Sequence, residues 1–289
     1  MLVRFGVLIL WLIHFLPFRL IVAIGNGLGA LLYLLAAERR RIGDINLALC
    51  FPNMNECERK KLLRAHFAMF ARGLIERSIL WWASAERIQR LIRVEGLEHF
   101  EAIKGQPAIL LTPHFVGMDA GGQWVAQHAD TVCMYANQKN VYLTELLLKK
   151  RARFRTQLLY SRQQGLRPII KGMRVGMPFI YPPDQDQGVK DGAFIPFFGV
   201  PAATMTSVSR IAQMTGAKVV PSITRVLPGC EGYVLTFYPA WENYPSGDEV
   251  LDARRMNEFI EQRILEMPDQ YFWLHKRFKT RPEGEAKFY

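Results

Sequence analysis

The sequence predicts an α/β domain that follows a membrane-inserted N-terminus. Three observations favour this fold class. Residues 20–37 are apolar and contain no charged residue, short apolar segments that resemble strands alternate with helical patterns further along, and half of the 289 residues are hydrophobic. A chain of this length and composition can bury a sizeable core, which excludes intrinsic disorder.

The apolar N-terminal region has the features of a membrane anchor. As a helix, residues 20–37 would be about 27 Å long, just short of the ~30 Å hydrocarbon core of a bilayer. Three arginines, Arg39, Arg40 and Arg41, follow it, and the positive-inside rule then places the rest of the chain in the cytoplasm. We therefore expect a membrane anchor over 1–41 and a cytoplasmic-face domain over 42–289.

The same stretch contains a variant of a dinucleotide-binding fingerprint, formed by Gly25, Gly27 and Ala30. The residues that follow, LLYLLAA, have no polar face, and a convincing second strand is missing. The pattern therefore favours the membrane anchor over a nucleotide-binding fold.

The remaining elements follow from hydrophobic periodicity. Leu63, Phe67, Phe70 and Leu74 recur at helical spacing and predict an amphipathic helix over 56–82. A second helix is expected over 252–266. Strands are expected at 108–111, 177–181, 217–223 and 233–237.

The stretch AILLTPHFVGMDAGG, residues 108–122, holds the first candidate site. His114 is expected where a buried strand ends and a helix begins, at the sheet edge where ligands bind in α/β folds. Asp119 follows five residues later, and Gly117 permits the turn that would bring the two together. A carboxylate on one imidazole nitrogen fixes the tautomer and leaves the other nitrogen free to accept a proton. The alternative is a loop histidine beside an ordinary N-terminal helix acid.

The formal charge of +11 is unevenly distributed. The window 139–174 holds ten basic residues against the single acid Glu145, and so carries +9. Such a window is either a solvated face or the mark of a polyanionic partner, such as a phosphorylated lipid, an acidic protein or a membrane surface. Aromatic and basic residues also interleave over 270–282, which suits a membrane surface or an anionic ligand better than nucleic acid in an anchored chain.

Two further motifs carry possible chemistry. Asp184 and Asp186 in PPDQDQG could hold a divalent metal on a sugar nucleotide, or one of them could pair with the basic window. Thr204 or Thr206 could cap a helix that binds phosphate, or simply cap it. The sequence lacks a Gly-x-Ser-x-Gly elbow, a Walker loop and a His-Glu-x-x-His zinc helix.

Taken in order, several segments resemble the late acyltransferases of lipid A biosynthesis, the lauroyl and myristoyl transferases of lipopolysaccharide assembly. These segments are RIGDINLALCFP, the His114–Asp119 motif, PPDQDQG, AFIPFFGVPAAT and YFWLHKRFKTRPEGE. The resemblance covers nearly the whole chain. One departure is Asp119, where many relatives carry glutamate; another is the loop after residue 135, which lacks the arginine and prolines common in relatives.

The resemblance implies a glycerophosphate-acyltransferase-like fold, a mixed sheet flanked by helices behind an N-terminal membrane helix. It implies transfer of a fatty acyl chain from acyl carrier protein to a hydroxyl of a lipid A precursor, at the cytoplasmic face of the inner membrane, without a metal or another cofactor. Its catalytic residues are His114 as general base and Asp119 as the carboxylate that orients it. Its substrate-binding residues are Arg151, Arg153, Asp184 and Thr204.

Two alternatives to acyl transfer stay open at this point. One is a metal-dependent membrane-bound glycosyltransferase that uses Asp184 and Asp186. The other is a basic, non-enzymatic membrane adaptor, for which the charges of 149–155 would matter and His114 would not.

Overall fold

The computed structural model describes residues 2–135 and 140–289 of the chain. Its helices are α1 (Leu2–Ile13), α2 (Phe18–Leu35), α3 (Ala37–Cys50), α4 (Glu56–Trp82), α5 (Ala85–Gln89), α6 (Leu97–Glu101), α7 (Met118–His128), α8 (Val141–Arg151), η1 (Arg162–Gln164), α9 (Arg167–Arg174), α10 (Ser207–Thr215) and α11 (Glu249–Glu266). Its strands are β1 (Ile92–Glu95), β2 (Ala108–Leu111), β3 (Thr131–Tyr135), β4 (Gln157–Ser161), β5 (Phe179–Tyr181), β6 (Gly192–Phe197), β7 (Val200–Met205), β8 (Lys218–Val226) and β9 (Tyr233–Phe237).

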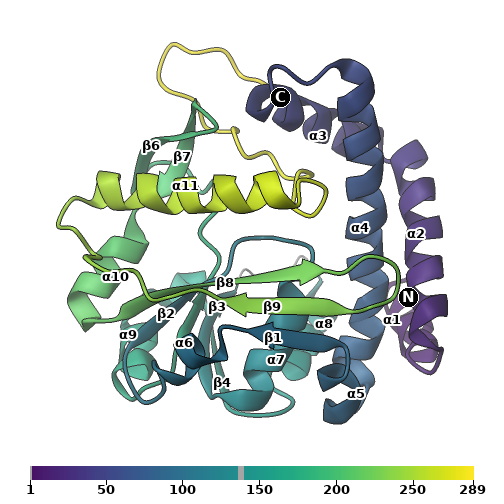
Figure 1. The fold of residues 1–289 in the computed structure, drawn as a ribbon, viewed down its shortest axis with the longest axis horizontal. Helices are drawn as coiled ribbons and strands as arrows, with labels where there is room; N and C mark the ends of the chain where they lie inside the picture. Colours follow the sequence, from purple (N-terminus) through teal and green to yellow (C-terminus); the bar gives the residue numbers. More distant parts are fainter. Residues whose placement is uncertain (1, 136–139) are drawn as a thin grey trace.

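A seven-stranded mixed sheet in the order β1-β9-β8-β2-β5-β3-β4 organises the chain. The pairs from β8 through β2, β5 and β3 to β4 are parallel, whereas β9 runs antiparallel to β8. Strand β2 therefore lies in the middle of the sheet, and its carboxyl end meets those of β5, β3 and β4 at one edge. Strands β6 and β7 form a separate antiparallel hairpin that lies beyond α11 in Figure 1. The predicted mixed sheet flanked by helices is confirmed.

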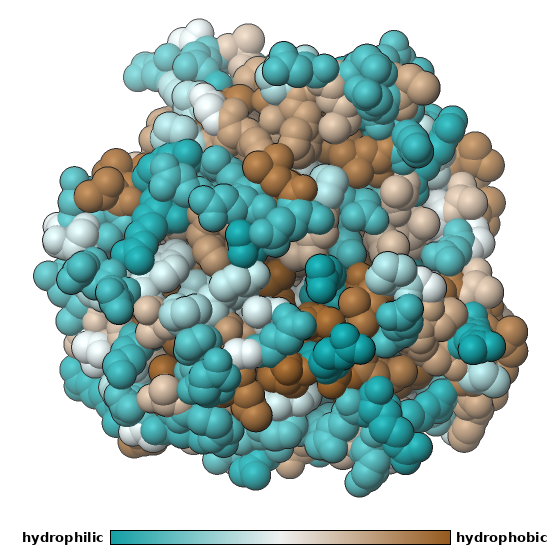
Figure 2. Space-filling model, in the orientation of Figure 1, coloured by the Kyte–Doolittle hydropathy of each residue, from teal (hydrophilic) through white to brown (hydrophobic). Residues whose placement is uncertain are grey.

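Helices α1 and α2 pack along the long helix α4 at the right of the view (Figure 1). In the same orientation, brown and tan atoms line this side of the molecule (Figure 2). Helix α2 is long and apolar enough to cross a membrane, as expected, and 22% of it is buried. The boundary expected at residue 41 falls inside α3, and Ile21 of α2 belongs to the same buried cluster as Ile75 and Ile79 of α4. The N-terminal helices and the α/β body thus share one core.

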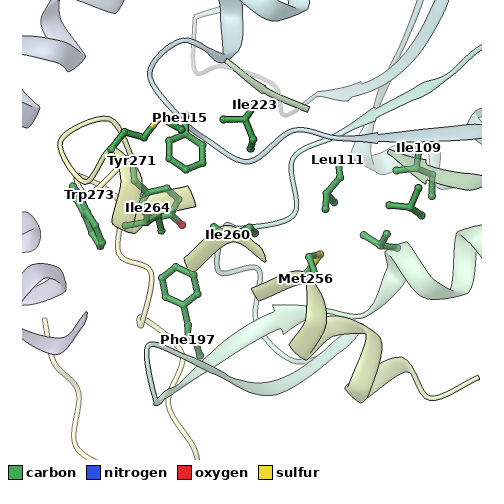
Figure 3. Packing of buried hydrophobic residues seen from close by; sticks show 14 of the residues in the cluster. Ile109, Leu111, Phe115, Phe197, Ile223, Met256, Ile260, Ile264, Tyr271 and Trp273 are labelled. Atoms are coloured by element: carbon green, nitrogen blue, oxygen red, sulfur yellow. The ribbon is translucent and has the colours of Figure 1, made fainter. Parts of the chain in front are cut away.

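Successive side chains of β2 point to opposite faces of the sheet and so belong to two different parts of the core. Ile109 and Leu111 face the side covered by α9, α10 and α11, where they join Met256 and Ile260 of α11 (Figure 3). Ala108 and Leu110 face the other side, with α4, α6 and α7. All four residues of β2 are fully buried, which explains its unbroken apolar run.

The elements with strong local patterns match their predictions. The helix predicted over 56–82 is α4, which begins with a capping box formed by Asn55 and Glu58. The strand expected at 233–237 is β9, and the helix expected over 252–266 is α11, which begins earlier, at Glu249.

Two segments differ from expectation. Residues 194–207, where only a helix cap at Thr204 or Thr206 was expected, form most of the β6–β7 hairpin, and its turn is made by Phe198 and Gly199, both with positive φ. Thr206 does directly precede α10, but its side chain makes no capping hydrogen bond. The segment 270–282 was expected to face a membrane or an anionic ligand. Its large side chains Tyr271, Trp273 and Phe278 are instead buried, because the segment passes through the core between α4 and the hairpin.

Candidate active site

His114 lies two residues after Thr112, the last residue that continues the pairing of β2 with β5, at the carboxyl edge of the sheet. Thr112 continues the pairing with β5 through its N–H and the carbonyl of Tyr181, at 3.0 Å. The carbonyl of His114 accepts a hydrogen bond from the N–H of Phe272 at 3.0 Å. The backbone of His114 is therefore fixed from two sides before its side chain makes any contact.

The imidazole of His114 is held by a carboxylate, and that carboxylate is Asp184. The Nδ1 atom lies 2.7 Å from Asp184 Oδ1, and the backbone N–H of His114 donates to Oδ2 at 3.0 Å. Asp184 follows β5, the strand beside β2, so the sheet brings together two residues that are 70 positions apart. Because Asp184 accepts at Nδ1, the Nε2 atom is the one left for proton transfer. It lies 3.2 Å from Nε2 of Gln185.

Asp119 occupies a different position from the one expected. It lies in the first turn of α7 and accepts a hydrogen bond from Arg77 Nε of α4 at 2.7 Å. The expectation that Asp119 is the carboxylate bonded to the imidazole is therefore corrected: Asp184 has that contact. Asp119 still lies close enough to His114 for its negative charge to raise the pKa of the imidazole.

The electrostatics of the site keep both carboxylates ionised. Burial alone raises the pKa of Asp184, but the His114 imidazole and its hydrogen bonds outweigh this and lower the pKa to about 2. Burial likewise opposes ionisation of Asp119, and the charges of Arg77 and Arg151 bring its pKa below the ordinary value.

The pKa of His114 moves in the opposite direction. Burial by itself lowers it, but the Asp184 carboxylate and, to a smaller extent, Asp119 more than offset this, so the pKa lies above its ordinary value of 6.5. The free imidazole is therefore a stronger base than histidine in water, and it takes up a proton at a higher pH.

A cavity of about 230 Å³ is lined by His114 and by Gln185, whose side chain contacts the Nε2 atom of His114. Its polar and charged lining residues include His114, Asp119, Arg151, Arg162 and Gln185, and its apolar lining residues include Met118, Ala126, Leu147, Leu148, Leu159 and Ile180. The polar lining suits charged or hydroxyl groups, and the apolar lining suits a hydrocarbon chain.

A second, smaller cavity of about 120 Å³ reaches His114 from the side of α4. It lies between Phe70, Leu74 and Arg77 of α4 and the ring of Phe272. His114 and Asp119 line both cavities, so the imidazole stands where the two meet.

The expected substrate-binding residues separate into those at the cavity and those away from it. Arg151, at the end of α8, lines the larger cavity. Arg153 instead donates to the carbonyl oxygens of Leu80 and Ala83 behind α4. Thr204 of β7 is 1% exposed, and it donates to Ala202 O and accepts from Arg277 Nη2 at 3.0 Å. The expectation of a substrate contact at Thr204 is corrected by this burial. Lys139, the first basic residue of the window 139–174, lies outside the described residues.

Arg151 and Arg153 form a matched pair for mutation. We expect Arg151→Ala to lower kcat/KM for a phosphorylated acceptor roughly tenfold or more, because a charge-assisted hydrogen bond contributes about 1.5–3 kcal/mol. We expect Arg153→Ala to leave kcat/KM nearly unchanged and to lower the free energy of unfolding by about 1–3 kcal/mol, since its contacts are internal. Steady-state kinetics and thermal unfolding of both variants would measure this, and equal kinetic losses would contradict it.

The two aspartates of PPDQDQG do not act as a pair. Asp186 accepts hydrogen bonds from the N–H of Thr280 at 2.6 Å, from its hydroxyl at 2.8 Å, and from the N–H of Gly188 at 2.9 Å. It therefore attaches the loop after β5 to the C-terminal segment, while Asp184 faces His114.

Sequence reasoning missed several cavity residues. Arg77 lies on a predicted helix, and Phe272 lies in the segment 270–282 with its aromatic–basic pattern, but nothing local marks either residue as part of a site. Arg162 was counted in the basic window without being selected, and Gln185 stands between the two aspartates that drew attention. The signal that could have found Gln185 is its place in the loop that follows β5, a strand that pairs with β2.

Comparison with known proteins identifies the family. The model of the bacterial lipid A biosynthesis acyltransferase family matches residues 1–280. The chain belongs to this family. It is therefore an acyltransferase that acts in lipid A biosynthesis, and the metal-dependent glycosyltransferase and non-enzymatic adaptor alternatives are set aside.

Relatives named for the transfer of different acyl groups have similar sequence identity to this chain. The chain is 34% identical over 287 residues to the lipid A biosynthesis lauroyltransferase of Escherichia coli, covering 98% of this chain and 93% of that protein. It is 31% identical to the palmitoleoyltransferase of the same organism, at 99% and 93% coverage, and 31% identical to the myristoyltransferase, at 88% and 80%.

Among solved structures, the chain is similar to the 1-acyl-sn-glycerophosphate acyltransferase of Thermotoga maritima. The likeness has a TM-score of 0.39 at 16% identity and covers 87% of this chain and 99% of the other. The assignment to acyl transfer therefore depends on the family match rather than on this likeness.

Proposed function

We propose that this family member transfers a fatty acyl chain from acyl carrier protein to a hydroxyl of a lipid A precursor, with His114 as the general base and Asp184 as the residue that orients it. The reaction takes place at the cytoplasmic face of the inner membrane. The observation that carries the proposal is the His114–Asp184 pair at 2.7 Å beside a cavity that is lined by both polar and apolar side chains, with the Nε2 atom of His114 held only by the side chain of Gln185 at 3.2 Å.

The proposed reaction conserves atoms and charge. Nε2 of His114 takes the proton of the acceptor hydroxyl as its oxygen attacks the thioester carbonyl, forming a new C–O bond and a tetrahedral oxyanion. The C–S bond then breaks, and the imidazolium returns the proton to the departing thiolate. Asp184 stabilises the imidazolium between the two steps, as its hydrogen bond to Nδ1 favours the charged ring.

The arginines at the cavity supply the positive charge that the substrates need. Arg151 and Arg162 line the same cavity as His114, and the charge of Arg162 acts on the imidazole. They are suited to the phosphate groups of the acceptor and to the developing oxyanion, because guanidinium groups bind planar or tetrahedral oxyanions through several donors. Asp119 accepts a hydrogen bond from Arg77 of α4, and its negative charge offsets part of the positive charge of the arginines.

The donor side of the proposal uses the basic region around the cavity. Lys149, Arg155 and Arg167 are exposed or nearly so on α8, before β4 and on α9. A cationic surface here favours an acidic carrier protein that presents its acyl thioester to the cavity, and it predicts a donor KM that rises with salt.

The preference of the enzyme for acyl donors of different length tests whether the apolar residues of the cavity hold the acyl chain. Gly122 of α7 lines the cavity, and a Cβ added there would meet nothing within 4 Å. We expect Gly122→Leu to fill the cavity and to shift the preferred donor to shorter chains by tenfold or more, since one methylene is worth about 1–3 kcal/mol in an apolar pocket. Competition between acyl donors of different length would measure the shift, and Gly122→Ala is the small control. An unchanged preference in Gly122→Leu would place the acyl chain elsewhere.

The function itself is tested with the purified protein in detergent. We expect it to acylate a lipid A precursor from acyl carrier protein thioesters and to add one acyl mass, read by mass spectrometry. Fragmentation of the product gives the acylated hydroxyl. Efficient transfer from acyl-coenzyme A but not from the carrier protein would contradict the donor, and the absence of a product with any lipid A precursor would contradict the acceptor.

A further inference from the structure

Helices α1 and α2 present a continuous apolar surface to the outside of the molecule. On α2, the exposed side chains include Leu20, Ile24, Leu31, Leu34 and Leu35, the last two about 70% exposed. On α1 and the turn after it they include Val3, Phe5, Leu8, Ile9, Trp11, Leu12 and Phe15. These helices lie on the side of the molecule where brown and tan atoms gather in Figure 2. An exposed apolar surface of this extent, on helices that include one long and apolar enough to cross a membrane, indicates contact with lipid.

The inner face of α2 is docked on α4 along its length. A Cβ added at Gly25 would lie 2.6 Å from the Cα of Arg72, and one added at Gly29 would lie 2.5 Å from the Cα of Ala68. The two glycines thus bring the helix backbones into contact. Near the end of α2, the ring of Tyr33 packs edge-on against Phe67 and beneath the guanidinium of Arg64.

Helix α4 is unsuited to the hydrocarbon core of a bilayer. It carries nine charged residues between Glu56 and Arg77. Arg72 and Glu76 form a buried ion pair at 2.5 Å directly beneath α2, and Lys61 and Arg64 are exposed near its other end. If α2 crossed the membrane while docked in this way, these charges would lie at the depth of the acyl chains, where charged side chains are rare and costly.

Helix α1 lies on the same side as the catalytic body. Arg87 of α5 donates to the carbonyl oxygens of His14 at 2.5 Å and Leu16 at 2.7 Å, which fixes the turn between α1 and α2. The guanidinium of Arg4 lies 5.3 Å from the ring of Tyr142, at the start of α8. The beginning of α1 is therefore next to the helix that lines the larger cavity, and it is not separated from the cavity by a bilayer.

We infer that α1 and α2 lie in the plane of the membrane as one amphipathic hairpin, with their apolar faces in a single leaflet and the N-terminus on the same side as the active-site cavity. This replaces the bilayer-spanning orientation that the length and composition of α2 permit, and it rests on the membrane location in the proposed function. The partner is a leaflet that contains anionic phospholipid, since the exposed arginines Arg19, Arg39 and Arg41 flank the apolar surface. A lipid acceptor then reaches the cavity laterally, past α1 and α8.

The topology is tested by protease protection of the full-length chain with an epitope tag at either the N- or the C-terminus. In sealed spheroplasts, both tags are expected to resist proteinase K, and both are expected to be digested after permeabilisation. Digestion of the N-terminal tag alone would overturn the in-plane hairpin. Digestion of both tags in spheroplasts would support the hairpin but overturn the proposed cytoplasmic face. Recovery of the chain in the soluble fraction without detergent would overturn the lipid contact itself.

A matched pair of glycine variants tests whether α2 stays on α4 in the membrane. Gly25→Leu places a side chain against the backbone of Arg72, whereas Gly27→Leu points into open space. With α2 docked in the membrane-bound protein, Gly25→Leu lowers the membrane-bound activity at least tenfold, and Gly27→Leu leaves it within twofold of the parent. Equal, small effects of both variants would show that α2 has left α4 and would overturn the inference.

Discussion

Replacing His114 with alanine is expected to reduce acyl transfer by about 10²–10⁴-fold, the usual contribution of a positioned general base. The backbone of residue 114 stays held by Phe272 and Asp184, so the fold should be kept, but buried Asp184 loses its imidazole partner and the free energy of unfolding is expected to fall. Single-turnover transfer from an acyl carrier protein thioester measures the loss. Membrane association should match that of the parent, and thermal unfolding should stay cooperative with a lower midpoint.

The control for His114→Ala is His99→Ala, which removes a histidine from α6, away from both cavities. It is expected to transfer at the parent rate. Parent-like transfer in His114→Ala would remove the imidazole from the mechanism and leave the cavity as a binding site only.

The second large effect is expected from Asp184→Asn. The change removes the carboxylate that bonds Nδ1, and in serine hydrolases the corresponding loss of tautomer control costs about 10⁴-fold in rate. We therefore expect a loss of about 10³–10⁴-fold for Asp184→Asn, with binding of the acceptor retained. Rates measured at saturating acceptor separate the two effects.

The pH dependence distinguishes Asp184 from Asp119. Activity needs the neutral imidazole, so kcat/KM of the parent rises with pH through a His114 pKa that lies above 6.5 and levels off beyond it. In Asp184→Asn, burial is no longer opposed by the bonded carboxylate, so the pKa falls and this acid limb moves to lower pH. Asp119→Asn also loses rate, because Arg77 loses its charged acceptor and Arg151 loses a nearby negative charge, but it moves the limb less. A larger shift in Asp119→Asn would restore Asp119 as the orienting carboxylate.

The sequence predicts the elements with apolar runs or helical periodicity well, and it misses a hairpin whose strands contain residues typical of loops. Strand β2 and helix α4 follow from runs of apolar residues and helical periodicity, which are properties of neighbouring residues. The β6–β7 hairpin was missed because Pro196, Gly199 and Pro201 are typical of loops. Its strands are instead supported by the packing of Phe197 and Ala202 in the core.

The candidate site shows the same division. His114 could be selected from the sequence, because a buried strand that ends in a histidine indicates a sheet edge. Its carboxylate could not be selected from spacing, since the pairing of β2 with β5 brings Asp184 to the imidazole and nothing near His114 in the chain reports that pairing. Likewise, Arg151 and Arg153 differ by two residues, and only the end of α8 decides which of them reaches the cavity.

The pH profile of the residual activity of His114→Ala tests the central claim most directly. If the imidazole of His114 is the base that takes the hydroxyl proton, the acid limb seen in the parent disappears and the small remaining rate no longer depends on a group that titrates above pH 6.5. A limb that persists at the same pH in this variant would mean that another group accepts the proton, and the assignment of His114 as the general base would be wrong.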